Sequence, residues 1–513
     1  MALLSITLVC ITLAIVVASY ILQHLESCKR RGISGPFPAA WSSLWLFYQC
    51  RRRRRYLAVD EAHRKYGKIV SIQPNHFSIA DADAIQAVYG HGNGFLKSDF
   101  YDAFAGPGHR SIFNTRSRRD HARKRRAIAH VFSARSICQF EPYIRTHIAR
   151  LVSQWTYMCQ NNSGSAKDGY YTFNALPWFS YLTFDVTGDL AFGAPFGMLS
   201  QGQDLVDERK TYDASPTCVA AIDVLNRQGD VSAALGCLPQ LKPFSKFLPD
   251  PFFRLGSKAV ENMAGIAIER VRRRLDPEAL AENTRMDILA KMMQSRDDSG
   301  ALLGRDELTT ESLAFLVAGS NTTAITLACM VHYVASTPGV MEKLHEAVDE
   351  VVPAGVDIPT YDMVKRIPYL DWVIWETLRF HSAFSLGLPR QIPIGSPPVD
   401  ICGQVFCAGQ VVSVPMYTLH HSEEIWGSGA DSFDPGRWDP GTRLTARQRG
   451  AFMPFSIGPR ACIGRNLAEM ELRCMAAALF RNFDFELEPA ELEFTDGFVR
   501  RPSALVIGVK RRI

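Results

Sequence analysis

Apolar residues recur at helical spacing along most of the chain, which predicts a mainly α-helical protein. The segments with this spacing are 56–66, 82–89, 120–132, 367–380 and much of 145–285. The longest helix is expected over 308–335, where Thr310 is the predicted N-cap and Pro338 ends the pattern. This segment is apolar on nearly all sides, so it belongs in the protein core. A membrane span is the competing interpretation of the same segment.

Short strands interrupt the helical pattern. Residues 68–72 and 77–80 alternate between apolar and polar positions around a central Pro-Asn pair, which predicts a β-hairpin. Further short strands are expected over 399–414 and 494–509. Residues 98–118 are irregular and rich in Gly and Ser, and long loops of this kind are often functional.

The N-terminus predicts a membrane anchor. Residues 2–22 carry no charge, and these 21 residues, at about 1.5 Å each, span the hydrocarbon core of a bilayer. Basic residues follow at 29–31, and the positive-inside rule then leaves the rest of the chain in the cytosol. A cleaved signal peptide is the alternative, but it usually has a basic start and a shorter apolar run.

The expected organisation is an anchor over 1–24, a basic, proline-containing hinge over 25–55 and one large domain over 56–513. Pro36 and Pro38 fix φ and stop the membrane helix from continuing. The five consecutive arginines at 51–55 are expected to be solvated and to contact anionic head groups.

Composition excludes several classes of protein. The net charge of +5 is small for 513 residues, and no basic stripe with interleaved aromatics is present, which argues against nucleic-acid binding. The twelve cysteines are scattered without a C-x-x-C pair, so neither a zinc site nor a disulfide framework is indicated. A reducing compartment fits this cysteine usage.

The strongest chemical signal is the segment Phe455–Gly464, FSIGPRACIG. Its cysteine, Cys462, stands between two glycines and just before a predicted helix that begins at Arg465. A thiolate there would face helix N-terminal amides, which favour negative charge. The glycines let the backbone approach a flat ligand closely. A buried structural cysteine is the alternative.

Every position of F-x-x-G-x-R-x-C-x-G is filled, and the segment resembles the haem-thiolate loop of the cytochrome P450 family. The resemblance implies a cytochrome P450 fold, mainly α with small β-sheets, in which 56–513 is a single haem domain behind an N-terminal membrane helix. It also implies haem b, with Cys462 as the axial ligand of the iron. The further residues implied to contact the haem are Phe455, Arg460, Arg390, and the pair His121 and Arg125, where His121 replaces the family's usual Trp.

A second resemblance lies inside the longest predicted helix. The segment 318–323, AGSNTT, is similar to the family's oxygen-activation segment, and Thr322 matches the threonine of its proton relay. Asn321 stands where the family usually has a carboxylate. An amide can order water but has no proton to donate at neutral pH, so we expect oxygen activation to be slower or differently gated.

A third set of residues is expected to be structural. Glu376 and Arg379 share a helix face, and an isolated pair of this kind is usually superficial. Arg437, in the segment DPGRW, resembles the arginine that completes the family's buried network behind the haem, although Gly436 replaces the usual Glu. The basic residues Arg123, Lys124 and Arg126 are expected to face outward as a docking patch.

These motifs occur in the family's order, and the resemblance implies a monooxygenase that inserts one oxygen atom from O2 into a small organic substrate. The chain lacks a Gly-x-Gly-x-x-Gly dinucleotide motif, so the electrons of NADPH must arrive from a partner. The implied partner is NADPH-cytochrome P450 reductase, with cytochrome b5 as a further donor. Such a protein is a single-pass protein of the endoplasmic reticulum membrane with a cytosolic catalytic domain.

Three stretches, 55–60, 82–104 and 190–198, look like the fungal benzoate 4-monooxygenase branch of this family, which implies a small aromatic acid as substrate. The implied pocket residues are Lys97, Tyr101, Phe104, Phe315, Ala318, Leu386 and Phe498, with Ser98 and Arg110 as further partners for a carboxylate. One alternative is a tailoring oxidase of fungal secondary metabolism with a different aromatic or terpenoid-type substrate. Another is a reductase-independent haem-thiolate enzyme or sensor.

Overall fold

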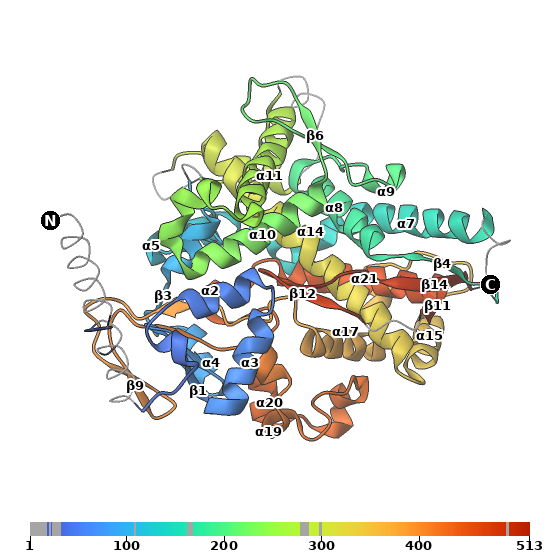
Figure 1. Cartoon of the computed structure of the whole chain (residues 1–513). Helices are drawn as coiled ribbons and strands as arrows, with labels where there is room; N and C mark the ends of the chain where they lie inside the picture. The colour runs from blue at the N-terminus through green and yellow to red at the C-terminus, as the bar shows by residue number, and fades with distance from the viewer. Residues whose placement is uncertain are drawn as a thin grey trace.

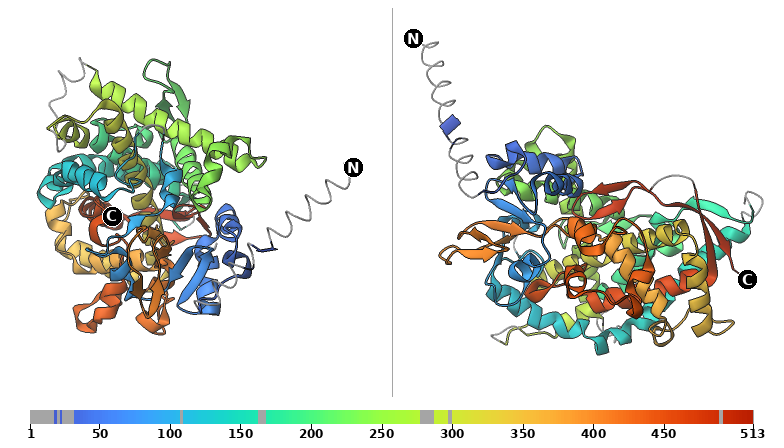
Figure 2. Two further views of the ribbon diagram at one scale, coloured as in Figure 1. Left: turned by 90° about the vertical axis from the view of Figure 1, so that its left-hand side faces the viewer. Right: turned by 90° about the horizontal axis from the view of Figure 1, so that it is seen from below.

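The computed structural model describes residues 18–19, 22, 32–106, 109–161, 168–276, 287–296, 300–488 and 492–512. Within these residues the chain is mainly helical, with five small sheets set among the helices (Figures 1 and 2). The predicted anchor over 1–24 lies almost entirely outside the described residues, so it stays a prediction.

The longest helix, α14 (Arg305–Ser336), runs through the centre of the molecule (Figure 1). It packs against α8 (Leu176–Phe192), α11 (Pro251–Leu275), α17 (Pro368–Phe380) and α21 (Arg465–Asn482). In the described part of the chain it is the one helix long and apolar enough to cross a membrane, and most of its apolar stretch is buried. Its position among four helices identifies it as the core helix, as the sequence pattern predicts.

The start of α14 differs from the prediction. The N-cap is Gly304, and Thr310 lies inside the helix, where its hydroxyl donates to the Asp306 carbonyl at 2.8 Å. Asp306 and Glu307 occupy the first turn, and acidic side chains stabilise a helix N-terminus. The helix therefore begins before the apolar pattern does.

Most other predicted helices are present. The segment α3 (Arg55–Tyr66) ends at Gly67, which has a φ of +97°, and α4 (Ala84–Tyr89) and α5 (Arg118–Ala129) follow. The remaining helical elements are η1 (Phe37–Ala40), α2 (Leu44–Arg51), η2 (Asp99–Phe104), η3 (His130–Phe132), α6 (Ala134–Ile137), η4 (Cys138–Phe140), α7 (Glu141–Asn161), α9 (Met198–Gln201), α10 (Ala221–Cys237), η6 (Pro239–Phe247), α13 (Ile288–Met293), α15 (Val340–Val351), α16 (Tyr361–Val364), α18 (Met416–His420), α19 (Glu423–Trp426), η7 (Pro435–Trp438), η8 (Pro440–Thr442), α20 (Ala446–Ala451) and η9 (Gly458–Arg460).

The predicted hairpin is formed by β1 (Ile69–Gln73) and β2 (His76–Ile79). It belongs to a five-stranded sheet of order β1-β2-β10-β7-β3, completed by β10 (Val411–Ser413), β7 (Arg390–Gln391) and β3 (Leu96–Lys97). Antiparallel pairing of β3 with β7 sets Lys97 directly opposite Arg390. Like charges in this position repel each other, so this edge of the sheet favours a bound anion.

The stretch 145–285 is less helical than predicted, because it contains β4 (Tyr171–Asn174), β5 (Val206–Glu208) and β6 (Thr217–Val219). The strand β4 completes a three-stranded sheet of order β11-β14-β4 with β11 (Phe483–Leu487) and β14 (Val506–Arg511). Two further pairs are β8 (Val399–Ile401) with β9 (Gln404–Phe406), and β12 (Phe494–Asp496) with β13 (Arg500–Pro502). The partners of β4 lie near the far end of the chain, so no local pattern marks this strand.

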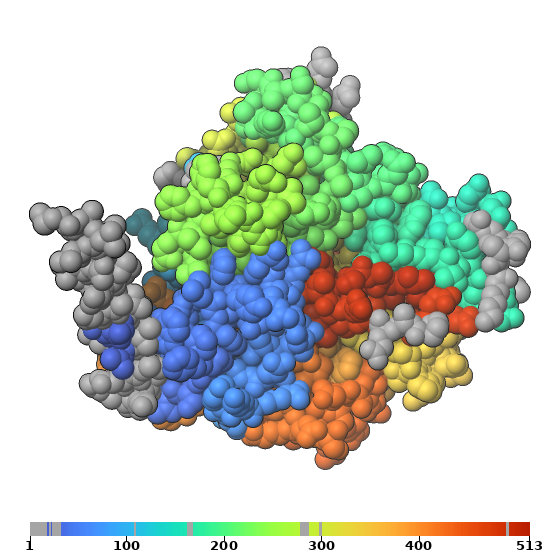
Figure 3. Space-filling view, in the orientation of Figure 1, coloured from blue at the N-terminus to red at the C-terminus, as the bar shows by residue number. Residues whose placement is uncertain are grey.

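The run of arginines at 51–55 is not simply a solvated charge cluster. Arg51 donates to both carboxylate oxygens of Asp250, at 2.6 and 3.1 Å, and Arg53 forms an ion pair with Asp230 at 2.9 Å. Arg55 is only 2% exposed. These contacts tie α2 and α3 to α10 and α11, and Figure 3 shows the blue N-terminal segment packed against the green segment that contains α10. Arg51, Arg53 and Arg55 are thus engaged within the protein, and Arg54 lies 3.9 Å from the Glu61 carboxylate.

Candidate active site

Cys462 lies in the turn between η9 and α21. Its backbone N–H donates to the Phe455 carbonyl at 2.9 Å, which closes the loop, and the Gly464 N–H donates to the sulfur. The Cys462 side chain is accessible although protein surrounds it, so the sulfur faces an internal space. The side chain of Ala318, midway along the largely buried α14, is accessible to solvent in the same way.

Gly458 is required by the packing of this loop. Its φ is +71°, and a Cβ at this position would lie 2.0 Å from the Tyr89 carbonyl oxygen of α4. An L side chain can satisfy neither condition without moving the backbone. The glycine therefore allows the loop of Cys462 to rest directly on α4.

Burial raises the pKa of the Cys462 thiol, while the Gly464 N–H and the cations Arg125 and Arg465 act in the opposite direction. Without a bound cation, burial thus outweighs the stabilisation of the thiolate that we expected from the helix amides. A metal cation at the sulfur reverses this balance, because a coordinating thiol loses its proton. Arg125 also donates to the Ala461 carbonyl at 2.9 Å, so it supports the loop beside the sulfur.

Buried and half-buried basic side chains form a cluster next to the loop. Arg460 donates to the carbonyls of Thr115 and Arg116, at 2.6 and 3.0 Å. Arg390 donates to the Tyr101 hydroxyl at 3.0 Å, and Lys97 to the Phe113 carbonyl. The cluster consists of Lys97, His121, Arg125, Arg390 and Arg460, none of which makes an ion pair with a carboxylate among the described residues.

Burial and neighbouring cations lower the pKa values in this cluster. The pKa of Lys97 falls well below its ordinary value, that of His121 falls to about 3, and that of Arg460 falls to about 10. An anionic ligand bound here would offset the repulsion between these positive groups. This cluster, the facing sulfur and the glycines of the loop fit a flat cofactor with two carboxylates, such as haem.

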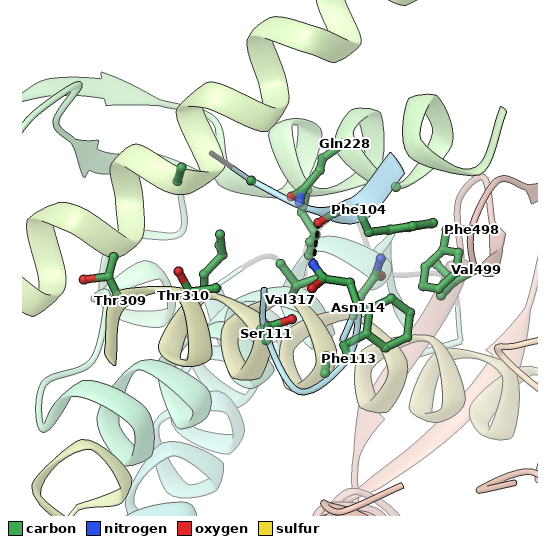
Figure 4. A pocket seen from close by; sticks show the side chains of 18 of the residues that line it. Phe104, Ser111, Phe113, Asn114, Gln228, Thr309, Thr310, Val317, Phe498 and Val499 are labelled. Carbon is green, nitrogen blue, oxygen red and sulfur yellow. Dashed lines mark hydrogen bonds between the residues drawn. The ribbon is translucent and has the colours of Figure 1, made fainter. Parts of the chain in front are cut away.

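The segment predicted to act in oxygen activation lies on α14 at the edge of a cavity. Figure 4 shows Val317, the residue just before this segment, in the cavity wall. The Thr322 hydroxyl donates to the Ala318 carbonyl at 2.9 Å, and Asn321 Nδ2 donates to Asn226 Oδ1 of α10 at 3.3 Å. A Cβ on Gly319 would lie 2.9 Å from Thr187 Oγ1, so this glycine lets α8 approach α14. Both predicted residues, Asn321 and Thr322, line the cavity.

The cavity has a volume of about 370 Å³ and lies between α10, α14 and the turn before β13. Of the predicted pocket residues, Phe104, Ala318 and Phe498 line it, and the rings of Phe104 and Phe498 are 4.4 Å apart. Phe113 adds a third ring, 5.6 Å from each of them. Most of the wall is apolar, which suits an aromatic ligand.

The other predicted pocket residues are not among those that line this cavity. Lys97 and Tyr101 belong to the basic cluster, Phe315 packs on Phe132 with ring centres 5.3 Å apart, and Leu386 lies near Arg55. Ser98 caps η2. Arg110 forms an ion pair with Asp102 at 2.7 Å. The pairing of β3 with β7 turns Lys97 toward the basic cluster.

Two amide side chains of the cavity wall, Asn114 and Gln228, belong to none of the motifs found in the sequence. Asn114 Nδ2 donates to the Phe104 carbonyl at 2.8 Å, whereas Asn114 Oδ1 and Gln228 Oε1 are buried without a hydrogen-bond partner among the described residues (Figure 4). Unpaired buried polar atoms in a ligand pocket mark places where a ligand can complete the hydrogen bonds. Asn114 lies in an irregular loop and Gln228 in an ordinary helix, so neither stands out locally.

The structure brings the predicted structural network together. Glu376 and Arg379 are both 0% exposed and form two hydrogen bonds, at 2.7 and 2.9 Å. Arg437 Nε lies 3.4 Å from the same carboxylate, and the Trp438 indole N–H donates to it at 2.9 Å. Arg379 also donates to three backbone carbonyls, including that of His420 at 2.6 Å.

The outward docking patch predicted from Arg123, Lys124 and Arg126 is only partly exposed. Lys124 is buried and pairs with Glu307 and with Glu311, the latter at 2.9 Å, and Arg123 pairs with Glu307 at 2.7 Å. Only Arg126 of the three is exposed. The two glutamates at the start of α14 draw the first two cations inward.

Glu471 of α21 is a buried carboxyl group that the sequence analysis did not identify. It accepts a hydrogen bond from the Thr323 hydroxyl of α14 at 3.3 Å, and burial raises its pKa to about 8. The sequence gives no clear signal for it, because the charged residues Glu469 and Arg473 stand two positions away on either side in the same helix. At neutral pH this group is protonated and can join α14 to the helix of the Cys462 loop.

We expect Glu471→Gln to stabilise the protein at pH 8 but not at pH 5. The unfolded carboxyl ionises near pH 4.5 and the folded one near pH 8, so the folded state binds the extra proton between these values. Stability of the parent therefore falls as pH rises through this window, by a few kcal/mol on an order-of-magnitude basis, and glutamine removes the effect. Thermal midpoints at both pH values measure it. Glu423→Gln, at an exposed carboxyl, is the control, and equal pH dependence of parent and Glu471→Gln would contradict the prediction.

Comparison with known proteins agrees with this arrangement. The family model described as Cytochrome P450 matches residues 35–507. Benzoate 4-monooxygenase bphA of Aspergillus niger is 55% identical over 98% of this chain and 96% of its own length. Cytochrome P450 monooxygenase astJ of Aspergillus oryzae is 32% identical over 91% of this chain and 88% of its own, and Cytochrome P450 monooxygenase ORF11 of Penicillium roqueforti is 30% identical over 94% and 95%. The chain therefore belongs to the cytochrome P450 family.

Proposed function

We propose that this cytochrome P450 monooxygenase hydroxylates benzoate, or a closely related small aromatic acid, at the ring carbon para to the carboxylate. The observation that carries the proposal is the 55% identity, over 98% of the chain, to a protein named benzoate 4-monooxygenase. The ring-lined cavity between α10 and α14 supports it, because three phenylalanines can hold one aromatic ring.

The proposed cofactor is haem b, with Cys462 holding the iron. The basic cluster would bind the two propionates, since its cations have no carboxylate partner among the described residues. When bound, the haem supplies the activation of O2, which thiolate ligation favours. The protein then contributes the orientation of the substrate, the exclusion of water and the supply of protons.

The substrate carboxylate is proposed to bind at Asn114 and Gln228. A carboxylate needs N–H donors, which rotation of the Gln228 amide presents in place of its unpaired oxygen, and the second N–H of Asn114 Nδ2 is a further donor. The rings of Phe104 and Phe498 would hold the aromatic ring at the same end of the cavity. Binding one end of the acid fixes which ring carbon is presented for oxidation.

Titration of the haem-loaded protein with benzoate tests this proposal through the spin-state change of the haem and through product analysis. We expect benzoate to bind and to yield the para-hydroxylated acid. Gln228→Leu should weaken benzoate binding but leave binding of uncharged methyl benzoate nearly unchanged. Failure of benzoate to bind or to be hydroxylated would overturn the proposed substrate class.

A tailoring oxidase with a larger aromatic substrate is the second candidate. The cavity extends along α14 from Thr322 to Asp306, which is further than a single benzoate ring requires. Conversion of a larger aromatic compound, with no conversion of benzoate, would favour this candidate.

Asn321 and Thr322 are proposed to order the water through which protons enter the cavity. We expect Thr322→Ala to lower the ratio of product formed to NADPH consumed several-fold and to raise peroxide release, because the hydroxyl is lost from the cavity wall. Asn321→Asp should keep the fold and change the rate or this ratio, since aspartic acid can donate a proton. The control is Thr326→Ala, one turn along α14, whose hydroxyl donates to the Thr322 carbonyl at 2.8 Å. If both variants match the parent, the segment is not the proton path.

Electrons are proposed to come from NADPH through NADPH-cytochrome P450 reductase, with cytochrome b5 as a second donor. The support is the exposed positive charge of Arg118, Arg119 and Arg126 on α5, the helix that Arg125 joins to the Cys462 loop. Such a surface favours an acidic partner. Turnover that requires the reductase, and that declines as salt is raised, would support this pairing, whereas turnover without the reductase would exclude it.

We also propose that residues 1–24 anchor the protein in the endoplasmic reticulum membrane, with the catalytic domain in the cytosol. Support comes from exposed apolar side chains that follow the anchor in the sequence, Phe37 and Leu44, and from others on η6, Phe244 and Phe247. One hydrophobic cluster joins α2 to η6. Membrane fractionation of the full chain tests the proposal, and recovery in the soluble fraction at low salt would contradict it.

A further inference from the structure

Two cysteines join α2 to α10 away from the proposed haem site. Cys50 is 3% exposed and Cys237 is 5% exposed, and their Sγ atoms lie 3.4 Å apart with one thiol donating to the other sulfur. Neither cysteine forms a disulfide within the described part of the chain. A separation of 3–3.5 Å is that of reacting atoms just before a bond forms.

A second cavity, of about 300 Å³, opens beside this pair. Its lining includes Cys237, Arg55 and His76. The Arg55 guanidinium is buried, its Nε and Nη1 atoms have no hydrogen-bond partner among the described residues, and it lies within hydrogen-bonding reach of Cys50. An incompletely paired cation next to a thiol is the usual environment of a reactive cysteine.

The two thiols are electrostatically different. The hydrogen bond from Cys237 and the nearby Arg55 cation hold the pKa of Cys50 below its ordinary value, against the effect of burial. The hydrogen bond with Cys50, together with burial, raises the pKa of Cys237 well above its ordinary value. Cys50 is thus the better thiolate, and Cys237 is the thiol that the cavity exposes to a small molecule.

We propose that Cys50 and Cys237 are a modification site at which hydrogen peroxide forms a reversible disulfide that fixes α10 to α2. Peroxide that enters the cavity beside Cys237 oxidises the Cys50 thiolate, 3.4 Å away, to a sulfenic acid and leaves as one water. The Cys237 sulfur then attacks the Cys50 sulfenic acid, the S–S bond forms, and the sulfenic oxygen leaves as a second water. Two thiols and one peroxide therefore give one disulfide and two waters. Reduction of O2 without product formation releases peroxide, so a cytochrome P450 can generate this oxidant itself.

The disulfide would act on ligand entry. Cys237 ends α10, and the same helix supplies Leu225, Asn226 and Gln228 to the wall of the larger cavity. A covalent link at its end limits movement of this wall relative to α2. Entry and release of ligands would slow, while the closed arrangement of the site would be retained.

The experiment uses the full-length, haem-loaded protein. It is exposed to hydrogen peroxide, treated with catalase, alkylated and digested without reduction, and the rate of phenylimidazole binding to the haem is measured in parallel. We expect a peptide that links Cys50 to Cys237, a several-fold slower binding rate, and recovery of both on adding dithiothreitol. Absence of the linked peptide overturns the proposal.

Matched variants separate this effect from damage to the haem. Cys50→Ser and Cys237→Ser should form no link and keep their binding rates after peroxide, whereas Cys138→Ser, at an exposed thiol, should respond as the parent does. If a serine variant does not fold, Cys50→Ala or Cys237→Ala replaces it. An equal, dithiothreitol-reversible loss of rate in Cys50→Ser would contradict the proposal, because another thiol would then be responsible.

Discussion

Cys462→Ala abolishes the thiolate-type spectrum of the carbon monoxide complex and all oxygenation, while most of the protein remains folded. The loop keeps its shape, because its closing contacts are made by backbone atoms: the Cys462 N–H to the Phe455 carbonyl, and Gly458 against Tyr89. What is lost is the sulfur that faces the internal space. Cys462→His offers the iron a nitrogen but still removes the thiolate, so it loses the same spectrum.

The measurement is the absorbance difference spectrum of the reduced protein with carbon monoxide, beside circular dichroism for the fold. Cys474→Ala is the matched control, because Cys474 is a buried cysteine of α21, the helix that follows the Cys462 loop, and burial raises its pKa to about 12. It should keep both the spectrum and the activity. A thiolate spectrum that survives in Cys462→Ala would place the iron ligand on another cysteine.

The second large effect is expected from Glu376→Ala, which should lose folded, haem-loaded protein rather than activity alone. Removing this carboxylate leaves Arg379 buried and Arg437 nearly buried without their shared anion. Stranding a buried charge costs about 3–5 kcal/mol, which is a large part of the stability of a typical protein. The carbonyls that bind Arg379 satisfy its N–H groups but do not neutralise its charge.

Yield, haem content per chain and thermal midpoint measure this loss. Asp362→Ala is the control, because Asp362 pairs with Lys365 at the same three-residue spacing but on the surface. Its replacement should leave all three quantities close to the parent. Normal yield and haem content in Glu376→Ala would show that the network is dispensable.

Local signals made part of this structure predictable. The hairpin at 69–79, the end of α3 at Gly67 and the burial of α14 each follow from residues close together in the chain. The motif around Cys462 is equally local. The position of Lys97 is not, because it depends on the pairing of β3 with β7, which are nearly 300 residues apart. A segment-by-segment assignment therefore put Lys97 in the substrate pocket.

The polar part of the cavity could not be predicted for a related reason. Asn114 and Gln228 come from separate segments, and only the folded chain brings them to one wall. Glu311 stands near the start of the longest predicted helix, where its sequence neighbours do not reveal its partners. In the structure its carboxylate accepts the Ile112 N–H at 3.0 Å and holds Lys124 inward, which removes a cation from the expected docking patch.

The carboxylate of Asp230 has a consequence for the order in which the protein matures. It accepts two hydrogen bonds from Arg501, at 2.9 and 2.8 Å, and pairs with Arg53, so it joins the beginning and the end of the chain at α10. During synthesis the N-terminal partner emerges first, and Arg501 leaves the ribosome long after α10 has done so. The part of the cavity wall that α10 forms therefore lacks the Arg501–Asp230 hydrogen bonds until then. Nascent chains that stall before residue 501 would present a loosely held α10 to chaperones, however much of the remaining protein had already folded.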